Sequence, residues 1–490
     1  MAAVVILSAF SALAEAPDRA PPPKKRPFDV SEGIALANNA KFSGQTGFVV
    51  FDLDTGAVLE DLNADLPLPP ASVAKLPTAM YALDRLGADY RFETRVGFNS
   101  QNGDMWLIGG GDPTLDTDDL AELAKNAVAA APNATGLRVD DLMFMHTERI
   151  DDFQPDVAAY NPSISGLNLN FNRVLMEWTR QSGKYSMLMD VRGRRHSPPA
   201  RTIDMHVVDR TPSGSVFDYQ DQAGPDQITR EVWSVAKSAL GRKGGRWLPV
   251  RRPGPYIGNA FRDLALEAGL VLPEPQFGVY WPGEAAAPVI ARQESLPLWR
   301  IVRGMMKYST NLTAEMIGLA AAGALGKHPA SLADSGVLMS DWAGVRIRGV
   351  FAMANHSGLS DDSRASPSAL ADLIRRADQT VYQRQDGEFS MRQLMTKMSV
   401  KEKGVRAPRH KAVIRVKTGT MNFVSTLVGF IEIKETGKRL GFAIMNADLA
   451  QRAKITDRNV EAPRGSKRYA RRTRRFQRDL IRSWIDRFGG

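Results

Sequence analysis

A short stretch near the start of the chain, PPASVAKL at residues 69–76, limits the possible fold more than any other part of the sequence. The apolar run that follows it, as far as Leu86, predicts a buried helix. Pro77 is tolerated only in the first turn of such a helix, where backbone N–H groups lack partners anyway. Ser72 and Lys75 are therefore predicted at the helix start, on one face, with roughly 5–6 Å between their Cβ atoms.

This pair of residue types is suited to nucleophilic catalysis. A serine hydroxyl attacks poorly at neutral pH unless a base lies within hydrogen-bond reach, and a lysine becomes that base when burial and a nearby cation lower its pKa. Ser-x-x-Lys alone is a weak signal, because the same four residues recur at 234–237. That second copy lacks a preceding strand hairpin and a long apolar helix, so we identify Ser72 as the nucleophile.

The rest of the chain divides into segments of different texture. A strand at 46–53, with a hairpin partner at 57–59, precedes the Ser72 helix, and short apolar strings between Gly-, Pro- and Arg-rich loops at 140–295 predict a separate β-rich insert. The other predicted elements are helices 117–131, 296–307, 314–325 and 367–377, and strands 412–417, 424–433 and 440–446. The last three strands predict an antiparallel meander.

Two further motifs occur in local structures that suit the chemistry. Ser309-x-Asn311 falls in the gap between two predicted helices, and Lys417 begins a Lys-Thr-Gly string at the end of a predicted strand. We expect Lys75 to take the proton of Ser72, while Ser309 and Lys417 relay a proton to the leaving amine and keep Lys75 partly neutral. Asn311 is expected to bind the backbone amide of the substrate.

The neighbouring residues are expected to hold the substrate carboxylate and the oxyanion. Lys417 and Thr418 offer a cation and a hydroxyl to a terminal carboxylate, and Gly419 allows a substrate strand to lie close. The backbone N–H groups of Ser72 and Thr420 are the predicted oxyanion hole, and each such donor is typically worth about 10²–10³ in rate.

Three motifs in this order resemble the low-molecular-mass penicillin-binding proteins, in particular the D-alanyl-D-alanine carboxypeptidase/endopeptidase family with a large insert after the first motif. The resemblance spans roughly residues 40–450. It rests on the strings PASVAK at 70–75, GGGDPTL at 109–115, YSTNLTAE at 308–315, SGLS at 357–360 and VKTGT at 416–420. It implies an α/β fold, in which a serine β-lactamase/transpeptidase-like domain (an antiparallel sheet flanked by helices) is split by a β-rich insert domain.

The resemblance also implies a division of the chain and an activity. Residues 1–27 would be a signal peptide and Pro-rich linker, 28–93 and 296–490 the transpeptidase-like catalytic domain, and 94–295 the inserted domain. The implied enzyme is a serine DD-peptidase that hydrolyses D-alanyl-D-alanine of peptidoglycan stem peptides, with D-alanine crosslinks as a further substrate. It would act through an acyl-serine intermediate and would bind β-lactams.

Two positions concern the specificity for the stem peptide. Many relatives have an arginine directly after Gly-Leu-Ser, which is implied in gripping a side-chain carboxylate of the peptide; this chain has Asp361 there. Asp140, in the insert, is the candidate for binding the free amine of the stem peptide. The alternative for Asp140 is a solvated turn.

The N-terminus and the composition bear on location and cofactors. Residues 2–14 are almost wholly apolar, end in Ala-Leu-Ala and precede a Pro-rich segment, which predicts a secretory signal and a periplasmic protein; a frayed apolar tail is the alternative. No apolar run reaches the ~18 residues of a transmembrane helix. The chain has no cysteine and its six histidines show no metal-ligand spacing, so we expect no disulfide, metal or other cofactor.

Positive charge is concentrated at the C-terminus. Residues 451–490 hold 13 Lys and Arg against 4 Asp and Glu, which accounts for most of the net charge of +10. The basic cluster at 471–475 is compatible with nucleic-acid or anionic-surface binding. An apolar stripe at helical spacing predicts instead an amphipathic helix packed on a sheet, with no nucleic-acid partner. The stripe consists of Phe476, Leu480, Ile481, Trp484, Ile485 and Phe488.

Two other functions stay open at this point. A serine β-lactamase needs a placed base for fast deacylation, and its first two motifs usually lie far closer together than Ser72 and Ser309 do here. A non-enzymatic cell-wall-binding protein with a basic tail should have incomplete motifs, whereas all three are intact in this chain.

Overall fold

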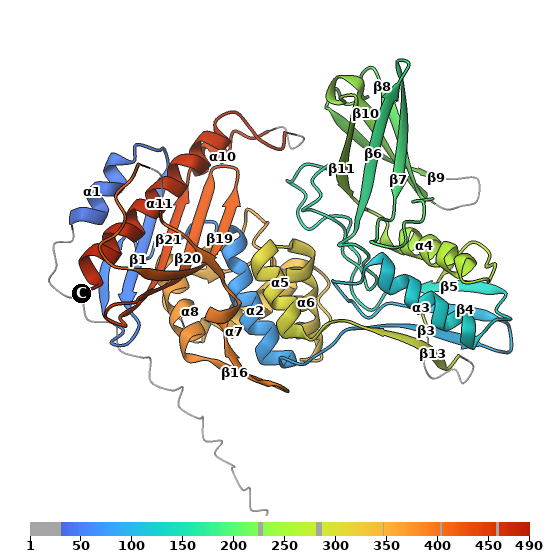
Figure 1. Cartoon of the computed structure of the whole chain (residues 1–490), viewed down its shortest axis with the longest axis horizontal. Helices are drawn as coiled ribbons and strands as arrows, with labels where there is room; N and C mark the ends of the chain where they lie inside the picture. Colours follow the sequence, from blue (N-terminus) through green and yellow to red (C-terminus); the bar gives the residue numbers. More distant parts are fainter. Residues whose placement is uncertain (1–30, 224–228, 281–286, 346, 402–403, 457–459) are drawn as a thin grey trace, which may run out of the picture.

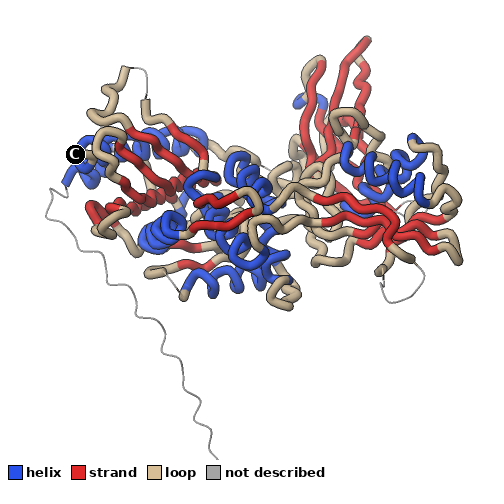
Figure 2. Tube along the Cα trace, turned by 60° about the horizontal axis from the view of Figure 1, so that its bottom comes forward, coloured by secondary structure: helices blue, strands red, loops and turns tan. Residues whose placement is uncertain are grey.

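The computed structural model describes residues 31–223, 229–280, 287–345, 347–401, 404–456 and 460–490. The predicted signal peptide and linker lie outside the described residues. Figure 1 shows two lobes side by side: a main domain, built from both ends of the chain, and an insert that the chain enters near residue 93 and leaves near residue 295. The strands of the two lobes also stay apart in the view of Figure 2.

The main domain is built on a six-stranded antiparallel sheet with the strand order β18-β19-β20-β21-β1-β2. Its strands are β1 (Gln45–Asp52), β2 (Val58–Leu62), β18 (Thr396–Met398), β19 (Ala412–Met421), β20 (Val424–Ile433) and β21 (Arg439–Ala447). Strands β20 and β21 are buried along nearly their whole length, because helices cover both faces of the sheet. The predicted meander is confirmed, and β19 runs beyond its predicted end to include the whole Lys-Thr-Gly string.

One face of the sheet packs against a cluster of helices around the central, almost fully buried α6. These helices are α2 (Lys75–Leu86), α5 (Leu298–Tyr308), α6 (Asn311–Gly323), α7 (Leu332–Gly344), α8 (Pro367–Gln379) and α9 (Met391–Leu394), with the 3₁₀ turn η1 (Ala71–Ala74) before α2. Two short hairpins complete this side: β14 (Phe351–Ala352) with β15 (Arg364–Ala365), and β16 (Val381–Arg384) with β17 (Gly387–Ser390). The arrangement confirms the predicted α/β class of an antiparallel sheet flanked by helices.

The opposite face of the sheet is covered by α1 (Ser31–Asn39) and the long C-terminal helix α11 (Ser466–Phe488), which follows α10 (Leu449–Arg452). All six residues of the predicted apolar stripe are buried in the cluster between α11 and the sheet, so the predicted packing of this helix is confirmed. Trp484 Nε1 also donates to the buried carboxylate of Glu60, which pairs with Arg487. These contacts anchor the C-terminal half of α11.

The insert contains a five-stranded sheet with the order β12-β5-β4-β3-β13 and two separate three-stranded sheets, β8-β10-β9 and β11-β6-β7. Its strands are β3 (Glu93–Asn99), β4 (Asp104–Ile108), β5 (Gly136–Asp140), β6 (Arg173–Gln181), β7 (Lys184–Asp190), β8 (Ile203–Val208), β9 (Phe217–Ala223), β10 (Thr229–Ala236), β11 (Lys243–Pro249), β12 (Gln276–Phe277) and β13 (Val289–Glu294). Helix α3 (Thr117–Ala130) was predicted, whereas α4 (Pro253–Glu267) lies in the segment predicted as strands and loops; the 3₁₀ turn η2 (Lys237–Ala239) follows β10.

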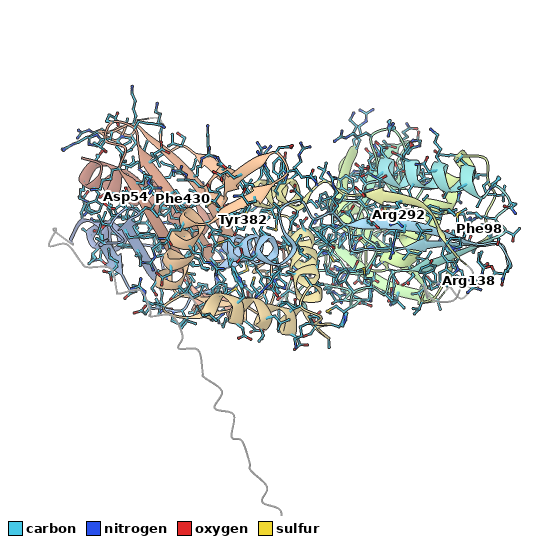
Figure 3. The ribbon with its side chains drawn as sticks, turned by 90° about the horizontal axis from the view of Figure 1, so that it is seen from below. Asp54, Phe98, Arg138, Arg292, Tyr382 and Phe430 are labelled. Atoms are coloured by element: carbon cyan, nitrogen blue, oxygen red, sulfur yellow. The ribbon has the colours of Figure 1, made fainter. Side chains whose placement is uncertain are left out.

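The two lobes have separate apolar cores. Seen from below, Phe430 and Tyr382 lie in the main domain, and Phe98, Arg138 and Arg292 lie in the insert (Figure 3). Among the helices that the structure describes, none is long and apolar enough to cross a membrane.

Candidate active site

Ser72 lies in η1, directly before the first turn of α2, where the sequence places it. The preceding residue, Ala71, has a left-handed backbone (φ 48°), which is unusual for a residue other than glycine and costs free energy that the surroundings must supply. Two glycines make room for this turn. A Cβ atom on Gly358 would lie 2.1 Å from the Ala71 carbonyl oxygen, and one on Gly419 would lie 3.0 Å from the Ser72 nitrogen.

Gly419 is enclosed on one side by the chain's own atoms. A Cβ atom there would lie 2.1 Å from Thr426 Oγ1, 2.8 Å from the Pro70 carbonyl oxygen and 3.0 Å from the Ser72 nitrogen, while the close approach of a substrate strand to the outer edge stays a prediction. Gly419 therefore joins β19 directly to the turn that carries the nucleophile.

Lys75 is fully buried and holds three groups with its ammonium nitrogen. Its Nζ lies 3.0 Å from Ser72 Oγ, 2.6 Å from Asn311 Oδ1 and 2.8 Å from the Ser357 carbonyl oxygen. Burial, and then the charge of Lys417, lower the pKa of Lys75 well below its usual value, although the charge of Glu315 opposes the shift. Lys75 therefore has both the geometry and the pKa of a base for Ser72.

The second cation of the site is Lys417, on β19. Its Nζ donates to Ser309 Oγ at 2.9 Å and to the Thr418 carbonyl oxygen at 2.9 Å. Burial lowers the pKa of Lys417 to about 8. Ser309, between α5 and α6, also has a left-handed backbone (φ 59°), which points its hydroxyl at this ammonium group.

The side-chain amide of Asn311 has a protein partner at each end. Its Oδ1 accepts from Lys75, and its Nδ2 donates 2.8 Å to the carbonyl oxygen of Tyr160, a residue of the insert. Because both ends of the side-chain amide have partners within the protein, Asn311 fixes Lys75 and ties the insert to the site. Nδ2 carries two N–H donors and the bond to Tyr160 uses one of them, so the binding of a substrate amide by Asn311 stays a prediction.

A buried glutamate that the sequence analysis did not assign completes the support of Lys75. The two carboxylate oxygens of Glu315 accept from the backbone N–H groups of His356 (2.9 Å) and Ser357 (2.8 Å), and Ser357 in turn accepts from Lys75. Glu315 stands four residues after Asn311 in α6, on the same face of the helix. That spacing is the signal in the sequence that could have identified it.

Replacing Glu315 with glutamine is expected to move the acid limb of the pH–rate profile to lower pH. The negative charge of Glu315 raises the pKa of Lys75, so its removal lowers that pKa and keeps the base neutral at lower pH. The NH2 group of the new glutamine cannot accept a hydrogen bond, so one of the two backbone N–H groups loses its acceptor. This loss lowers the free energy of unfolding by about 1–3 kcal/mol. Glu122→Gln, at an exposed position of α3, is the control. An acid limb that stays at the same pH, or moves to higher pH, would contradict the role of Glu315 in setting the pKa of Lys75.

The motif residues line one cavity of about 900 Å³. They are Ser72, Ser309, Asn311, Thr418 and Thr420. The insert contributes a loop at 152–155 and Tyr160, and the C-terminal region contributes residues on both sides of α10 and the start of α11. Strand β18 pairs with β19 only as far as Val416, so in the described part of the chain the outer edge of residues 417–421 has no strand partner beside this cavity.

Asp140 is not among the residues that line this cavity. Its carboxylate accepts from the backbone N–H groups of Leu142 (3.0 Å) and Tyr280 (2.8 Å) at the end of β5. These bonds favour the alternative for Asp140, a turn, and the loop at 152–155 and Tyr160 are the parts of the insert that line the cavity.

Asp361, which stands where many relatives have arginine, does line the cavity and forms an ion pair with Arg452 of α10. The guanidinium group of Arg452 thus lies beside the residue after Gly-Leu-Ser, but its charge is balanced there. The sequence analysis did not identify Arg452, and nothing in its local sequence marks it.

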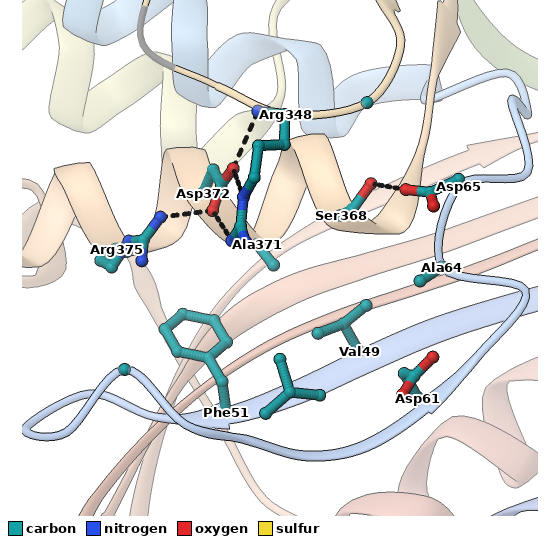
Figure 4. Close-up of a pocket in the computed structure, with 13 residues that line it drawn as sticks. Val49, Phe51, Asp61, Ala64, Asp65, Arg348, Ser368, Ala371, Asp372 and Arg375 are labelled. Carbon is teal, nitrogen blue, oxygen red and sulfur yellow. Dashed lines mark hydrogen bonds and ion pairs between the residues drawn. The ribbon is translucent and has the colours of Figure 1, made fainter. Parts of the chain in front are cut away.

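A second cavity, of about 590 Å³, lies between α8 and the strands β1 and β2 (Figure 4). Its walls include Val49 and Phe51, and its two arginines are paired, since Arg348 and Arg375 both bond to Asp372. It contains none of the motif residues. In the described residues no cluster of three or more His, Asp or Glu side chains could hold a metal ion.

Comparisons with known proteins place the chain in a family. A sequence profile of the D-Ala-D-Ala carboxypeptidase 3 (S13) family matches residues 35–463. The D-alanyl-D-alanine carboxypeptidase of an Actinomadura species is 28% identical over 438 residues, covering 82% of this chain and 77% of the relative. Carboxypeptidase DacB of Mycolicibacterium smegmatis is 27% identical over 447 residues, covering 87% and 81%.

The fold is also found in solved structures. The crystal structure of penicillin-binding protein 4 (dacB) from Haemophilus influenzae matches with a TM-score of 0.69 at 18% identity, covering 93% of this chain and 99% of that one. A structure of the same protein with a β-lactam matches with a TM-score of 0.65 at 18% identity, over 93% and 99% of the two chains.

Proposed function

Because this chain belongs to the D-Ala-D-Ala carboxypeptidase 3 (S13) family, we propose that it is a serine-type carboxypeptidase that removes D-alanine from D-alanyl-D-alanine ends of peptidoglycan stem peptides. One observation carries the proposal: the ammonium nitrogen of the buried Lys75 lies 3.0 Å from Ser72 Oγ and has a lowered pKa. A hydroxyl next to a neutral amine is the arrangement that acyl transfer requires.

In the first step Lys75 takes the proton of Ser72 Oγ as this oxygen attacks the carbonyl carbon of the penultimate D-alanine. Negative charge develops on the carbonyl oxygen, and the backbone N–H groups of Ser72 and Thr420 are the donors assigned to it. Each donor of this kind is typically worth about 10²–10³ in rate, because it is already oriented before the reaction.

The second step breaks the peptide bond. The proton that Lys75 took passes to the leaving amine through the hydroxyl of Ser309, which the ammonium of Lys417 supports at 2.9 Å, so that Lys75 is neutral again. D-alanine leaves, and Ser72 keeps the rest of the peptide as an ester. Water, activated by Lys75, then hydrolyses this ester and restores the free serine. A D-alanine crosslink differs only in the amine that leaves, so the same groups serve endopeptidase cleavage.

The substrate peptide binds along the open edge of β19. Residues 417–421 lack an outer strand partner among the described residues and border the cavity, so an extended peptide can add to the sheet there by backbone hydrogen bonds. A β-lactam occupies the same place and acylates Ser72. The apolar N-terminal segment with its Ala-Leu-Ala site supports export, which would bring the enzyme to peptidoglycan in the periplasm.

D-alanine release from an N-acylated tripeptide that ends in D-alanyl-D-alanine tests the proposal. We expect steady release, and a burst of one equivalent followed by slow turnover with the chromogenic β-lactam nitrocefin, because the stable acyl-enzyme blocks the site. Rapid steady hydrolysis of nitrocefin without D-alanine release would indicate a β-lactamase instead. Peptidoglycan binding with neither reaction would indicate a wall-binding protein.

A further inference from the structure

The first half of α11 presents a row of basic side chains at the active-site cavity. Lys467, Arg471 and Arg474 are spaced by four and three residues, which places them on one face of the helix, and all three line the cavity and are exposed. Figure 1 shows α11 running across the sheet, so that its apolar second half is fixed on the sheet while its first half reaches the end of β19 and β20.

This row carries positive charge that no ion pair balances in the described part of the chain. Three other charged groups of the cavity are paired, since Arg452 pairs with Asp361 and Glu461 pairs with Arg246, and Asp152 also lines the cavity. By contrast, no ion pair of Lys467, Arg471 or Arg474 occurs within the described residues. Exposed cations that converge on a cavity and form no ion pair within the described residues favour an anionic ligand there.

Arg474 is the member of the row nearest to the reacting groups. Its Nη2 donates to Thr420 Oγ1 at 3.3 Å, and no other hydrogen bond of this guanidinium occurs in the described structure. Thr420 and Thr418 are both exposed and lie two residues apart on β19, so their side chains point to the same side of the strand. The arginine and the two hydroxyls therefore meet at one edge of the cavity.

Lys417 is poorly suited to be the cation that holds the substrate carboxylate. Its side chain is 2% exposed and bonded to Ser309 and Thr418, and its pKa is lowered to about 8. An arginine stays charged at all physiological pH values, and its planar group can donate two parallel hydrogen bonds to a carboxylate.

We propose that Arg474 binds the free carboxylate of the terminal residue of the substrate, together with the hydroxyls of Thr418 and Thr420. This inference rests on the proposed function, because the D-alanine that a carboxypeptidase releases carries such a carboxylate next to the scissile bond. Arg474 thereby favours substrates whose leaving amine carries a free carboxylate next to the scissile bond. Arg471 and Lys467 extend the attracting field outward along the helix.

Two matched peptides test the inference: an N-acylated tripeptide ending in D-alanyl-D-alanine, and the same peptide with a C-terminal carboxamide. The wild-type enzyme should prefer the free acid. Arg474→Gln should lower kcat/KM for the acid by about 10- to 100-fold, mainly through KM, and leave the carboxamide nearly unchanged, so the preference disappears. Arg474→Lys, which keeps the charge without the planar fork, should restore part of the preference.

The adjacent Arg475 supplies the matched control, because it is exposed and does not line the cavity. Arg475→Gln should leave both rates unchanged. If Arg474→Gln lowers kcat/KM equally for the acid and the carboxamide, or lowers neither, the inference is wrong. The proposed function would still stand, because the wild-type enzyme releases D-alanine. If Arg474→Gln loses binding to an anionic wall polymer but keeps the preference for the free acid, the inference is wrong and Arg474 binds the polymer instead. A wild-type protein that releases no D-alanine would overturn the proposed function itself.

Discussion

Ser72→Ala is expected to abolish D-alanine release and covalent labelling by β-lactams, with a loss in kcat on the order of 10⁶-fold, as for the removal of a serine nucleophile that acts with its base. The hydroxyl is the group that forms the ester, and Lys75 cannot replace it because its ammonium nitrogen is fully buried and held by Asn311 and Ser357. Intact-mass measurement after incubation with a β-lactam checks this result, since the adduct adds the whole mass of the inhibitor.

The chain supplies its own matched control, Ser234→Ala. Ser234 stands in the same Ser-Val-Ala-Lys string, but it lies in β10 of the insert, where it pairs with His206 and Asp218 of the neighbouring strands. Lys237 follows outside the strand and bonds to Asp209. We therefore expect the Ser234 variant to be labelled as fast as the wild type. An adduct that survives in Ser72→Ala and disappears in Ser234→Ala would refute the assigned nucleophile.

The control also shows why the site could be predicted in part. A tetrapeptide does not determine its own conformation, but Ser72 comes with a preceding hairpin, a long apolar run and a proline that is tolerated only at a helix start. These local signals predicted the position of Ser72 and Lys75 correctly. Contacts between distant residues, such as Lys75 with Asn311 and Lys417 with Ser309, required the fold, which the resemblance implied and the family match and fold comparison confirmed.

Roles that depend on a third partner could not be predicted. The amide of Asn311 also bonds to the carbonyl oxygen of Tyr160 in the insert, and no periodicity in the sequence indicates where that loop lies. Gly419 is a glycine because the turn at Ser72 approaches it, a contact between segments more than 300 residues apart. Asp140 resembled a ligand-binding acid in sequence, yet two backbone N–H groups already use its carboxylate.

Helix α4 was missed for a local reason. It begins with Pro253, Gly254 and Pro255, residue types that usually interrupt helices and that made this segment resemble a loop. In the first turn, however, the missing N–H of proline costs nothing, so the same residues are compatible with a helix start. For α11, the sequence predicted the apolar stripe that packs on the sheet. It did not predict that Arg471 and Arg474 line the active-site cavity, because this depends on how far the helix extends past β19.

Lys75→Met is expected to reduce the rate of Ser72 acylation by roughly 10²–10⁴, the usual contribution of a general base. Methionine has a similar length and suits a fully buried position, so the variant should fold, although the oxygens of Asn311 and Ser357 lose their donor. Lys237→Met, at the surface of the insert, is the control and should acylate normally.

The pH dependence separates the roles of the two lysines. In the wild type the rate should rise with pH as Lys75 loses its proton, because the base must be neutral, and should fall above a pH of about 8, where Lys417 loses the proton that supports the leaving group. Lys75→Met should lose the rising limb and keep the falling one, because Lys417 still titrates. A variant that retains the rising limb would show that another group takes the proton of Ser72, and the acylation mechanism assigned to the pair Ser72 and Lys75 would then be wrong.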